Sequence, residues 1–278
     1  MFMIVSSPNW ILMWVSLEIN SMIFLMISNK FSKSFSEFEF KYYLIQFLGS
    51  SLYFYSGVMN FSYMLFLSLM IKLIMIPFIY WVITGLKWME KKIFFSFIFF
   101  QKIGPLILIW EMMVFNTMGE MLFLILNFLF SMMSGLKKIF INEILVFSSV
   151  NQVVLMVLIM KFSKSLFFIY ALIYFFTSLL IFLIYSFMKG SMILIFSFLL
   201  ISGFPPSLIF FSKISFLIFL MDKLLILIMI LSITTSMFFI YMKLFLNHIF
   251  KKKKLKLHSV NYSHCLFFII IFLFMLLG

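Results

Sequence analysis

Cysteine and arginine are almost missing from this chain: of its 278 residues one is cysteine, Cys265, and none is arginine. A single cysteine excludes an intrachain disulfide and a cysteine-ligated zinc or iron–sulfur site. Because all 21 basic residues are lysines, the chain lacks the bidentate forks with which arginine recognises phosphate, and we expect no nucleic-acid partner. The motifs GxGxxG, Walker loop and GxSxG are absent too. We therefore expect no prosthetic group and no metal site in this chain.

Charge is also scarce, whereas apolar residues are abundant. Hydrophobic residues make up 65% of the chain and charged residues 10%, against about 45–50% and about 25% in soluble domains. With a mean hydropathy of +1.24, the chain is predicted to be all-α, a polytopic membrane helix bundle in a single domain (1–278). A span needs about 20 apolar residues. We predict about ten transmembrane helices, near residues 10–29, 41–58, 61–85, 92–110, 117–135, 141–160, 166–188, 191–220, 223–247 and 263–277.

The lysines are distributed unevenly between the predicted loops. Loops facing the compartment of synthesis are enriched in lysine, so the lysine-poor side, where both termini lie, is predicted to be the opposite one. The segment HIFKKKKLKLH (248–258) is either the retention signal of a lysine-rich loop or a patch that binds anionic lipids. Fourteen lysines follow odd-numbered helices (Lys30, Lys33, Lys41, Lys87, Lys91, Lys92, Lys137, Lys138, Lys189, Lys251, Lys252, Lys253, Lys254, Lys256) and three follow even-numbered ones (Lys161, Lys164, Lys223).

Four ionisable residues lie inside the predicted spans: Glu18, Lys72, Lys102 and Lys213. A charged side chain at the centre of a bilayer costs about 2.5–3.5 kcal/mol on insertion scales. Lysines near the end of a span reduce this cost by extending to the interface, but Lys72 and Lys102 stand near the middle of theirs. We therefore predict that these four residues are functional.

Proline interrupts the helix beside two of these lysines. Pro77 follows Lys72 in KLIMIPF, and the segment GFPPS precedes Lys213. Proline leaves a backbone carbonyl without its helical donor, and open backbone at membrane depth is tolerated only where protein or water satisfies it. Such interruptions in corresponding positions of two halves indicate an ion path. Because desolvation disfavours charge, carboxylate–lysine pairs that form and open in such a path predict a proton relay.

These residues follow one another in a specific order: Glu, then Lys-Pro, then Gln-Lys-Pro, then Pro-Pro-Lys. In this order the sequence resembles the subunit 2 family of NADH dehydrogenase in mitochondrial complex I, an antiporter-like, proton-translocating family of membrane-arm subunits. The matching stretches run from residue 14 to about 215: WVSLEIN (14–20), KYYLIQFLGS (41–50), KLIMIPFIYW (72–81), FQKIGPL (100–106), GLKKIFINEILVFSSVNQ (135–152) and SGFPPSLIFFSK (202–213).

The resemblance implies a fold and a set of partners. It implies two inverted five-helix repeats, each with a Pro-broken helix, with residues 10–135 as a first half truncated at its N-terminal end and 141–277 as the second half with the C-terminal helix. Protons move through this subunit, while NADH, FMN, the iron–sulfur clusters and ubiquinone belong to other subunits. The implied partners are the other membrane-arm subunits and lipids, with cardiolipin a candidate. The implied location is the mitochondrial inner membrane, with both termini in the intermembrane space.

The resemblance also implies a role for each intramembrane charge. Glu18 matches the family's glutamate and Lys72 the broken-helix lysine, and these two would act as a coupled pair. Lys102 matches the central connecting lysine and would be the central relay. Lys213 matches the lysine after the second break and would be the group on the exit side or next to a neighbouring subunit.

The chain departs from the family pattern at three places. Ile79 replaces a histidine, which removes a hydration site, and Ile74 replaces a usual glycine. Where relatives carry Leu-Arg-Lys this chain has Ile-Asn-Glu (141–143), which inverts a loop charge that Lys137 and Lys138 are placed to compensate.

Two other classes of protein also fit these features. A free-standing cation/proton antiporter would share the fold but work without partners. A structural membrane subunit with an inactive channel would fit the short N-terminal region and the lost histidine. Ion exchange by the isolated chain would favour the first, and pumping that survives neutralisation of all four charges would favour the second.

Overall fold

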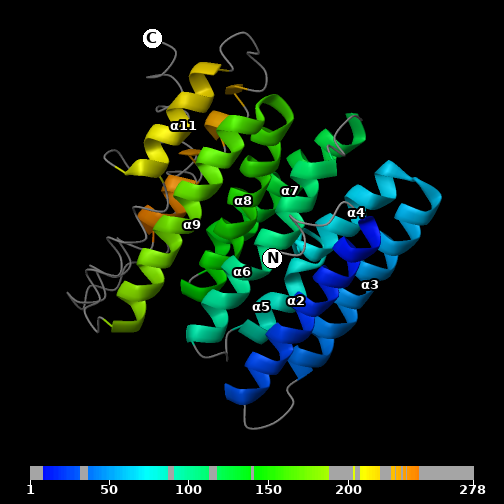
Figure 1. Cartoon of the computed structure of the whole chain (residues 1–278). Helices are drawn as coiled ribbons and strands as arrows, with labels where there is room; N and C mark the ends of the chain where they lie inside the picture. The colour runs from blue at the N-terminus through cyan, green and yellow to red at the C-terminus, as the bar shows by residue number, and fades with distance from the viewer. Residues whose placement is uncertain are drawn as a thin grey trace. The chain divides into compact units, whose positions relative to one another are not determined.

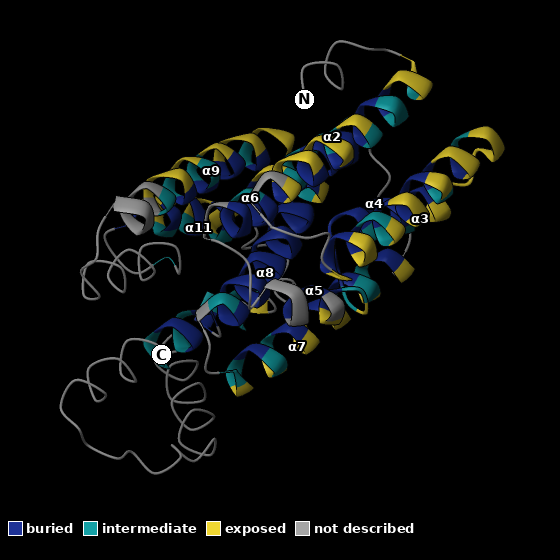
Figure 2. Ribbon diagram, turned by 90° about the horizontal axis from the view of Figure 1, so that it is seen from below, coloured by how far each residue is buried: buried dark blue, intermediate teal, exposed yellow. Residues whose placement is uncertain are grey.

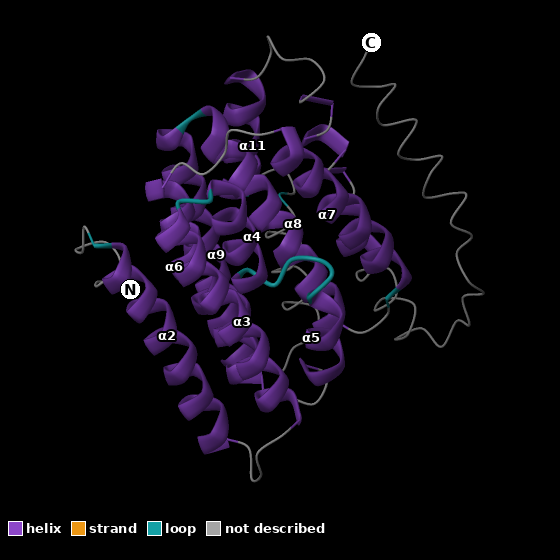
Figure 3. Ribbon diagram, turned by 90° about the vertical axis from the view of Figure 1, so that its right-hand side faces the viewer, coloured by secondary structure: helices purple, strands orange, loops and turns teal. Residues whose placement is uncertain are grey.

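The structure is a computed structural model, and it describes residues 9–31, 37–86, 91–112, 118–138, 141–187, 203, 207–219, 227–228, 230–232, 234–235 and 237–243. The chain divides into two compact units, Met1–Ala171 and Leu172–Gly278, which are treated separately below. Among the described residues the regular secondary structure is entirely helical, as predicted, and short loops join the helices (Figure 3).

The first unit holds the helices that carry three of the four predicted site residues. Helices α2 (Trp10–Phe31) and α3 (Glu37–Met59) run in opposite directions, so the start of α2 lies beside the end of α3, where the Trp10 ring is 5.1 Å from the Phe54 ring (Figure 1). The helices are α2 (Trp10–Phe31), α3 (Glu37–Met59), α4 (Ser62–Lys72), α5 (Ile79–Leu86), α6 (Lys91–Met112), α7 (Met118–Lys137) and α8 (Ile141–Phe162).

Helix α8 forms the most deeply buried element. Its side chains from Glu143 to Met160 are all buried, and this stretch of α8 is dark blue in Figure 2. Helices α2, α3 and α7 instead leave one face exposed, and that face is apolar, with Met26 67%, Phe40 54% and Leu122 61% exposed. Exposed apolar faces of this kind fit a hydrocarbon environment rather than water.

Four of the described helices are long and apolar enough to cross a membrane: Trp10–Asn29, Ile93–Glu111, Gly119–Lys137 and Asn142–Phe162. Helix α3 has the necessary length, but tyrosine, glutamine and serine on its buried face lower its hydropathy. The predicted helix at 61–85 is divided into α4 and α5, which is the break expected near Pro77. Six other predicted ranges coincide with α2, α3, α6, α7, α8 and α9 (Lys164–Phe187) to within a few residues.

In the second unit the described structure centres on α11 (Leu208–Phe219). Ser207 precedes α11, and its Oγ accepts a hydrogen bond from the Phe210 N–H at 3.2 Å, as expected of a helix N-cap. The predicted helix at 191–220 is therefore seen only in its last part. The predicted helix at 263–277, the lysine segment 248–258 and both prolines of GFPPS lie outside the described residues.

Candidate functional site

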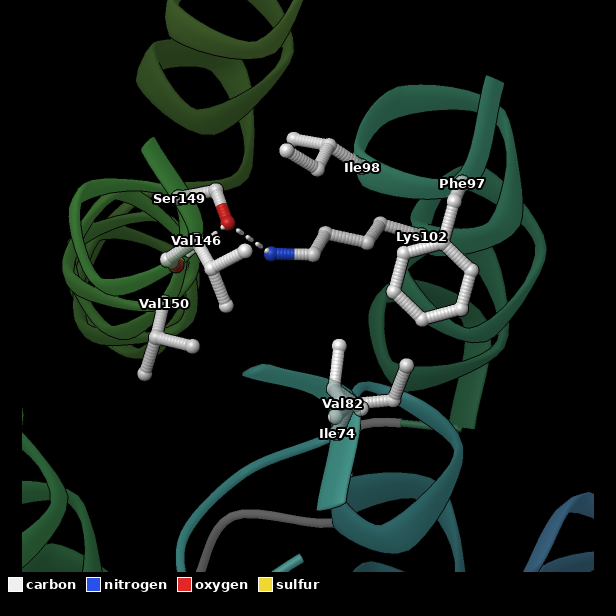
Figure 4. A pocket seen from close by; sticks show the side chains of 8 residues that line it. All are labelled: Ile74, Val82, Phe97, Ile98, Lys102, Val146, Ser149 and Val150. Atoms are coloured by element: carbon white, nitrogen blue, oxygen red, sulfur yellow. Dashed lines mark hydrogen bonds between the residues drawn. The ribbon is translucent and has the colours of Figure 1, made fainter. Parts of the chain in front are cut away.

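Lys102 reaches from the middle of α6 toward α8. Its side chain is 5% exposed, and its Nζ donates a hydrogen bond of 2.8 Å to Ser149 Oγ (Figure 4). Ser149 Oγ in turn lies 2.7 Å from the Val146 carbonyl and donates to it, so it is free to accept from the lysine. An ammonium group has three N–H donors, and Ser149 uses one of them. The remaining donors allow Lys102 to bind a water molecule or another polar group.

A small cavity lies beside Lys102. The cavity volume open to a water molecule is about 10 Å³, which is just enough for one water. Apart from Lys102 and Ser149 the lining is apolar, with side chains from α5, α6, α8 and the segment after α4 (Figure 4). The lining residues are Ile74, Val82, Phe97, Ile98, Lys102, Val146, Ser149 and Val150.

Lys72 is the last residue of α4 and is 3% exposed. It packs against α3 at Gly49, where an added Cβ would lie 3.0 Å from Lys72 Cγ. The absence of a side chain at Gly49 therefore makes room for the lysine. Glu18 of α2 interacts electrostatically with Lys72, but these two described side chains form no ion pair within 4.0 Å. The structure thus places Glu18 and Lys72 within electrostatic range of each other, without an ion pair between them.

The break between α4 and α5 begins with a Schellman motif. The Met75 N–H bonds to the Met70 carbonyl at 3.1 Å and the Ile74 N–H to the Ile71 carbonyl at 3.0 Å. Ile74 has a φ of 60°, the left-handed conformation that favours glycine. For a β-branched residue this backbone is unusual and costs roughly 1–2 kcal/mol. This conformation agrees with the glycine that the resemblance implies at this position.

Two amide side chains from neighbouring helices satisfy backbone groups of the break. Gln46 Nε2 of α3 donates to the Lys72 carbonyl at 3.4 Å, and Asn127 Oδ1 of α7 accepts from the Ile76 N–H at 2.7 Å. Asn127 is 2% exposed and its Nδ2 donates to the Phe123 carbonyl at 2.9 Å. Because lipid offers no hydrogen-bond partner for open backbone, such side-chain partners allow the helix to be broken here.

A polar network connects α2, α3 and α6 close to Glu18. Gln101 Oε1 accepts hydrogen bonds from Asn20 Nδ2 at 3.0 Å and from the Tyr42 hydroxyl at 3.1 Å. The Tyr42 side chain is fully buried and interacts electrostatically with Glu18. Since Gln101 precedes Lys102 in α6, the network links the helix of Glu18 to that of the central lysine.

Lys213 lies in α11 of the second unit and is 5% exposed. Its Nζ packs against Gly203, where an added Cβ would be 2.9 Å away. Gly203 has a φ of 85°, a left-handed backbone conformation that favours glycine, and its lack of a side chain leaves room for the lysine. Each of the two lysines beside a predicted break thus lies against a glycine.

The carboxylate of Glu143 is paired with a lysine, as expected from the positions of Lys137 and Lys138. Lys138 Nζ lies 3.4 Å from Glu143 Oε2, and the Glu143 side chain is almost completely buried. Lys138 is partly exposed, so the pair lies at the end of α8 rather than inside the bundle.

Several residues of the site were not predicted from the sequence. Ser149, Tyr42, Gln101, Gln46 and Asn127 each contact a site lysine, the break or the network beside Glu18. Isolated amides in apolar spans, such as Asn127 in LILNFLF, were the available signal. Within the described residues no three His, Cys, Asp or Glu side chains gather as a metal site, and the absence of a cofactor stays a prediction.

Comparison with known proteins identifies relatives, although no protein-family model matches the chain. A protein of Rhipicephalus sanguineus, "NADH-ubiquinone oxidoreductase chain 2", is 32% identical over 92% of this chain and 88% of its own length. Proteins of the same name from Anopheles gambiae and Artemia franciscana are 31% and 32% identical over 69% and 54% of this chain. This chain spans 58% and 49% of the length of those two relatives. The order of motifs and the match to the Rhipicephalus sanguineus protein over 92% of this chain agree, and the chain belongs to the NADH-ubiquinone oxidoreductase chain 2 family.

Proposed function

We propose that this chain is a core membrane-arm subunit of proton-pumping NADH:ubiquinone oxidoreductase, complex I, in the mitochondrial inner membrane. It translocates protons through Glu18, Lys72, Lys102 and Lys213. Glu18 and Lys72 act as a coupled pair, Lys102 as the central relay, and Lys213 as the group on the exit side or next to a neighbouring subunit. The partners are the other membrane-arm subunits and membrane lipids, including cardiolipin.

The observation that carries this proposal is the placement of Lys102. A lysine at the middle of a 22-residue helix, 5% exposed and bonded to a serine of another helix, does not reach either end of the bundle. Burying such a group is costly, and buried ionisable residues of membrane proteins most often mark an ion or proton path. A proton relay also needs polar neighbours. Lys102 has Ser149 and the small cavity beside it, and Glu18 and Lys72 lie within electrostatic range of each other.

The proposal includes an arrangement in the membrane. It consists of ten spans forming two inverted repeats, residues 10–135 and 141–277. Both termini face the intermembrane space and the 248–258 loop faces the matrix, because the loops predicted on that side hold fourteen lysines and the others three. Protease added to intact mitoplasts reaches only the intermembrane-space side of the inner membrane, so we expect it to leave the 248–258 loop uncut. Cleavage of this loop would show that the orientation is the opposite one.

Assembly provides the test of the function itself. An affinity-tagged chain should co-migrate on a native gel with NADH:ubiquinone oxidoreductase activity. NADH, FMN and the iron–sulfur clusters should be bound by other subunits, so the isolated chain should carry no flavin, haem or iron. A chain that purifies alone and exchanges cations for protons in liposomes would instead be an antiporter. A complex that pumps normally after all four charges are neutralised would make this chain a structural subunit.

A further inference from the structure

Helix α3 has a polar inner face along its whole length. Its outer face is apolar, with Phe40, Phe47 and Leu48 about half exposed (Figure 2). Buried polar groups within a membrane bundle are costly unless they are paired or functional. Six of its eight buried residues are polar and form what we call the polar seam: Glu39, Tyr42, Gln46, Ser50, Tyr53 and Ser56.

Two tyrosines of the polar seam each lie within electrostatic range of a carboxylate on a neighbouring helix. Tyr42 interacts electrostatically with Glu18 of α2, and Tyr53 with Glu111 of α6. Eleven residues separate the tyrosines, which corresponds to about three turns and about 16 Å along one face of the helix. The part of the seam from Tyr42 to Tyr53 therefore extends from the level of Glu18 to the end of the unit where α2 begins and α6 ends.

Glu111 has one oxygen turned inward. Its Oε2 is buried and has no hydrogen-bond partner among the described residues, and the same holds for Oε1 of Glu18. The Glu111 side chain as a whole remains partly accessible. An unpaired buried carboxylate oxygen is costly unless it takes up a proton or a water. Glu111 thus has an inner atom suited to receive a proton and an outer surface suited to release it.

The surroundings of Glu111 place it near the surface of the membrane. The preceding residue, Trp110, has the exposed Lys164 Nζ 5.7 Å from its ring centroid. Trp10 lies at the same end of the unit, packed against Tyr53. Tryptophans and lysines of this kind are typical of the membrane–water interface. A carboxylate at this level can exchange protons with bulk water.

We propose that Glu111 is a further proton-carrying residue, which exchanges protons with water at the end of the bundle where α2 begins and connects to Glu18 along the polar seam of α3. A proton leaves the Glu18 carboxyl, passes by hops between hydroxyl groups and water, and is bound by the Glu111 carboxylate before it is released. The Tyr53 hydroxyl both accepts and donates, so it can pass the proton on without net change. This inference rests on the proposed function.

The decisive experiment is Glu111→Gln in the assembled complex, with protons translocated per NADH oxidised measured in reconstituted vesicles. A positioned proton-transfer group typically contributes a factor of about 10² or more to the rate, so we expect loss of most of the proton translocation that depends on this chain. Glu111→Asp retains a carboxylate and should restore most of the translocation, which a role in packing alone would not predict. The matched control is Glu37→Gln, because Glu37 also lies on this bundle but its side chain is 91% exposed; it should pump normally.

Tyr53→Phe provides a second and independent measurement, which also decides the matter if Glu111→Gln does not assemble. It removes only the hydroxyl and should lower translocation in the same direction. Normal pumping by Glu111→Gln or by Tyr53→Phe, together with poor pumping by Lys102→Met, would overturn the role of Glu111 and leave the proposed function in place. Normal pumping by all three variants would overturn both.

Discussion

Lys102→Met should give a complex that assembles but translocates protons poorly. Methionine is similar to lysine in length and fills the space beside Ser149, so the contact between α6 and α8 is retained. Removing the charge eases insertion by up to roughly 3 kcal/mol on insertion scales, so assembly should not suffer. The proton site is lost, however. Proton translocation and the NADH oxidation coupled to it should both fall, measured in reconstituted vesicles with assembly followed on native gels.

A structural role for Lys102 predicts the opposite pattern. A lysine that only packs would be replaced by methionine with normal pumping and equal or greater stability. Lys41→Met serves as the matched control, since the Lys41 side chain is 52% exposed and pairs with Glu37 at 3.2 Å near the start of α3. Surface pairs of this type contribute about 0–1 kcal/mol. Full activity with methionine at position 102 would remove the relay role.

The second large effect is expected at Asn127, which holds the broken helix together. In Asn127→Leu the Ile76 N–H loses the acceptor that lies 2.7 Å away, deep within the unit. An unpaired buried backbone group costs about 1–3 kcal/mol, and little water reaches this depth to replace the bond. We expect a lower midpoint of thermal unfolding for the complex. Because Lys72 ends α4 at this break, we also expect weaker proton translocation.

Asn127→Asp is the control that separates hydrogen bonding from packing. A protonated aspartic acid has the same shape as asparagine, with a carbonyl oxygen to accept from Ile76 and a hydroxyl to donate to Phe123. It should therefore keep most of the stability and translocation that leucine loses. Equal stability of the leucine variant and the native chain would mean that the Ile76 N–H finds another partner and that Asn127 does not hold the break.

The hydropathy and charge of the sequence were enough to predict the positions of the helices and of the charged residues within them. The apolar runs predicted seven helices of the described part to within a few residues, including the interrupted one, because the need to bury about 20 residues of backbone in lipid is local to each segment. The positions of Glu18, Lys72, Lys102 and Lys213 could be chosen from sequence for the same reason. A charge within an apolar span is visible without knowledge of its neighbours. Pro77 likewise marked the break, since its missing N–H is a property of the residue itself.

The tertiary structure alone decided how these residues are paired. Ser149 as the partner of Lys102, Gly49 beside Lys72 and Asn127 at the Ile76 N–H each depend on the rotation and register of two helices. Such pairings join residues 23 to 51 positions apart, which no local pattern encodes. The left-handed backbone at Ile74 was hidden for a related reason, because isoleucine gives no sign of a conformation that surrounding contacts impose. The sequence by itself therefore determined which side chains are charged within the membrane, and only helix packing decided which groups those charges can reach.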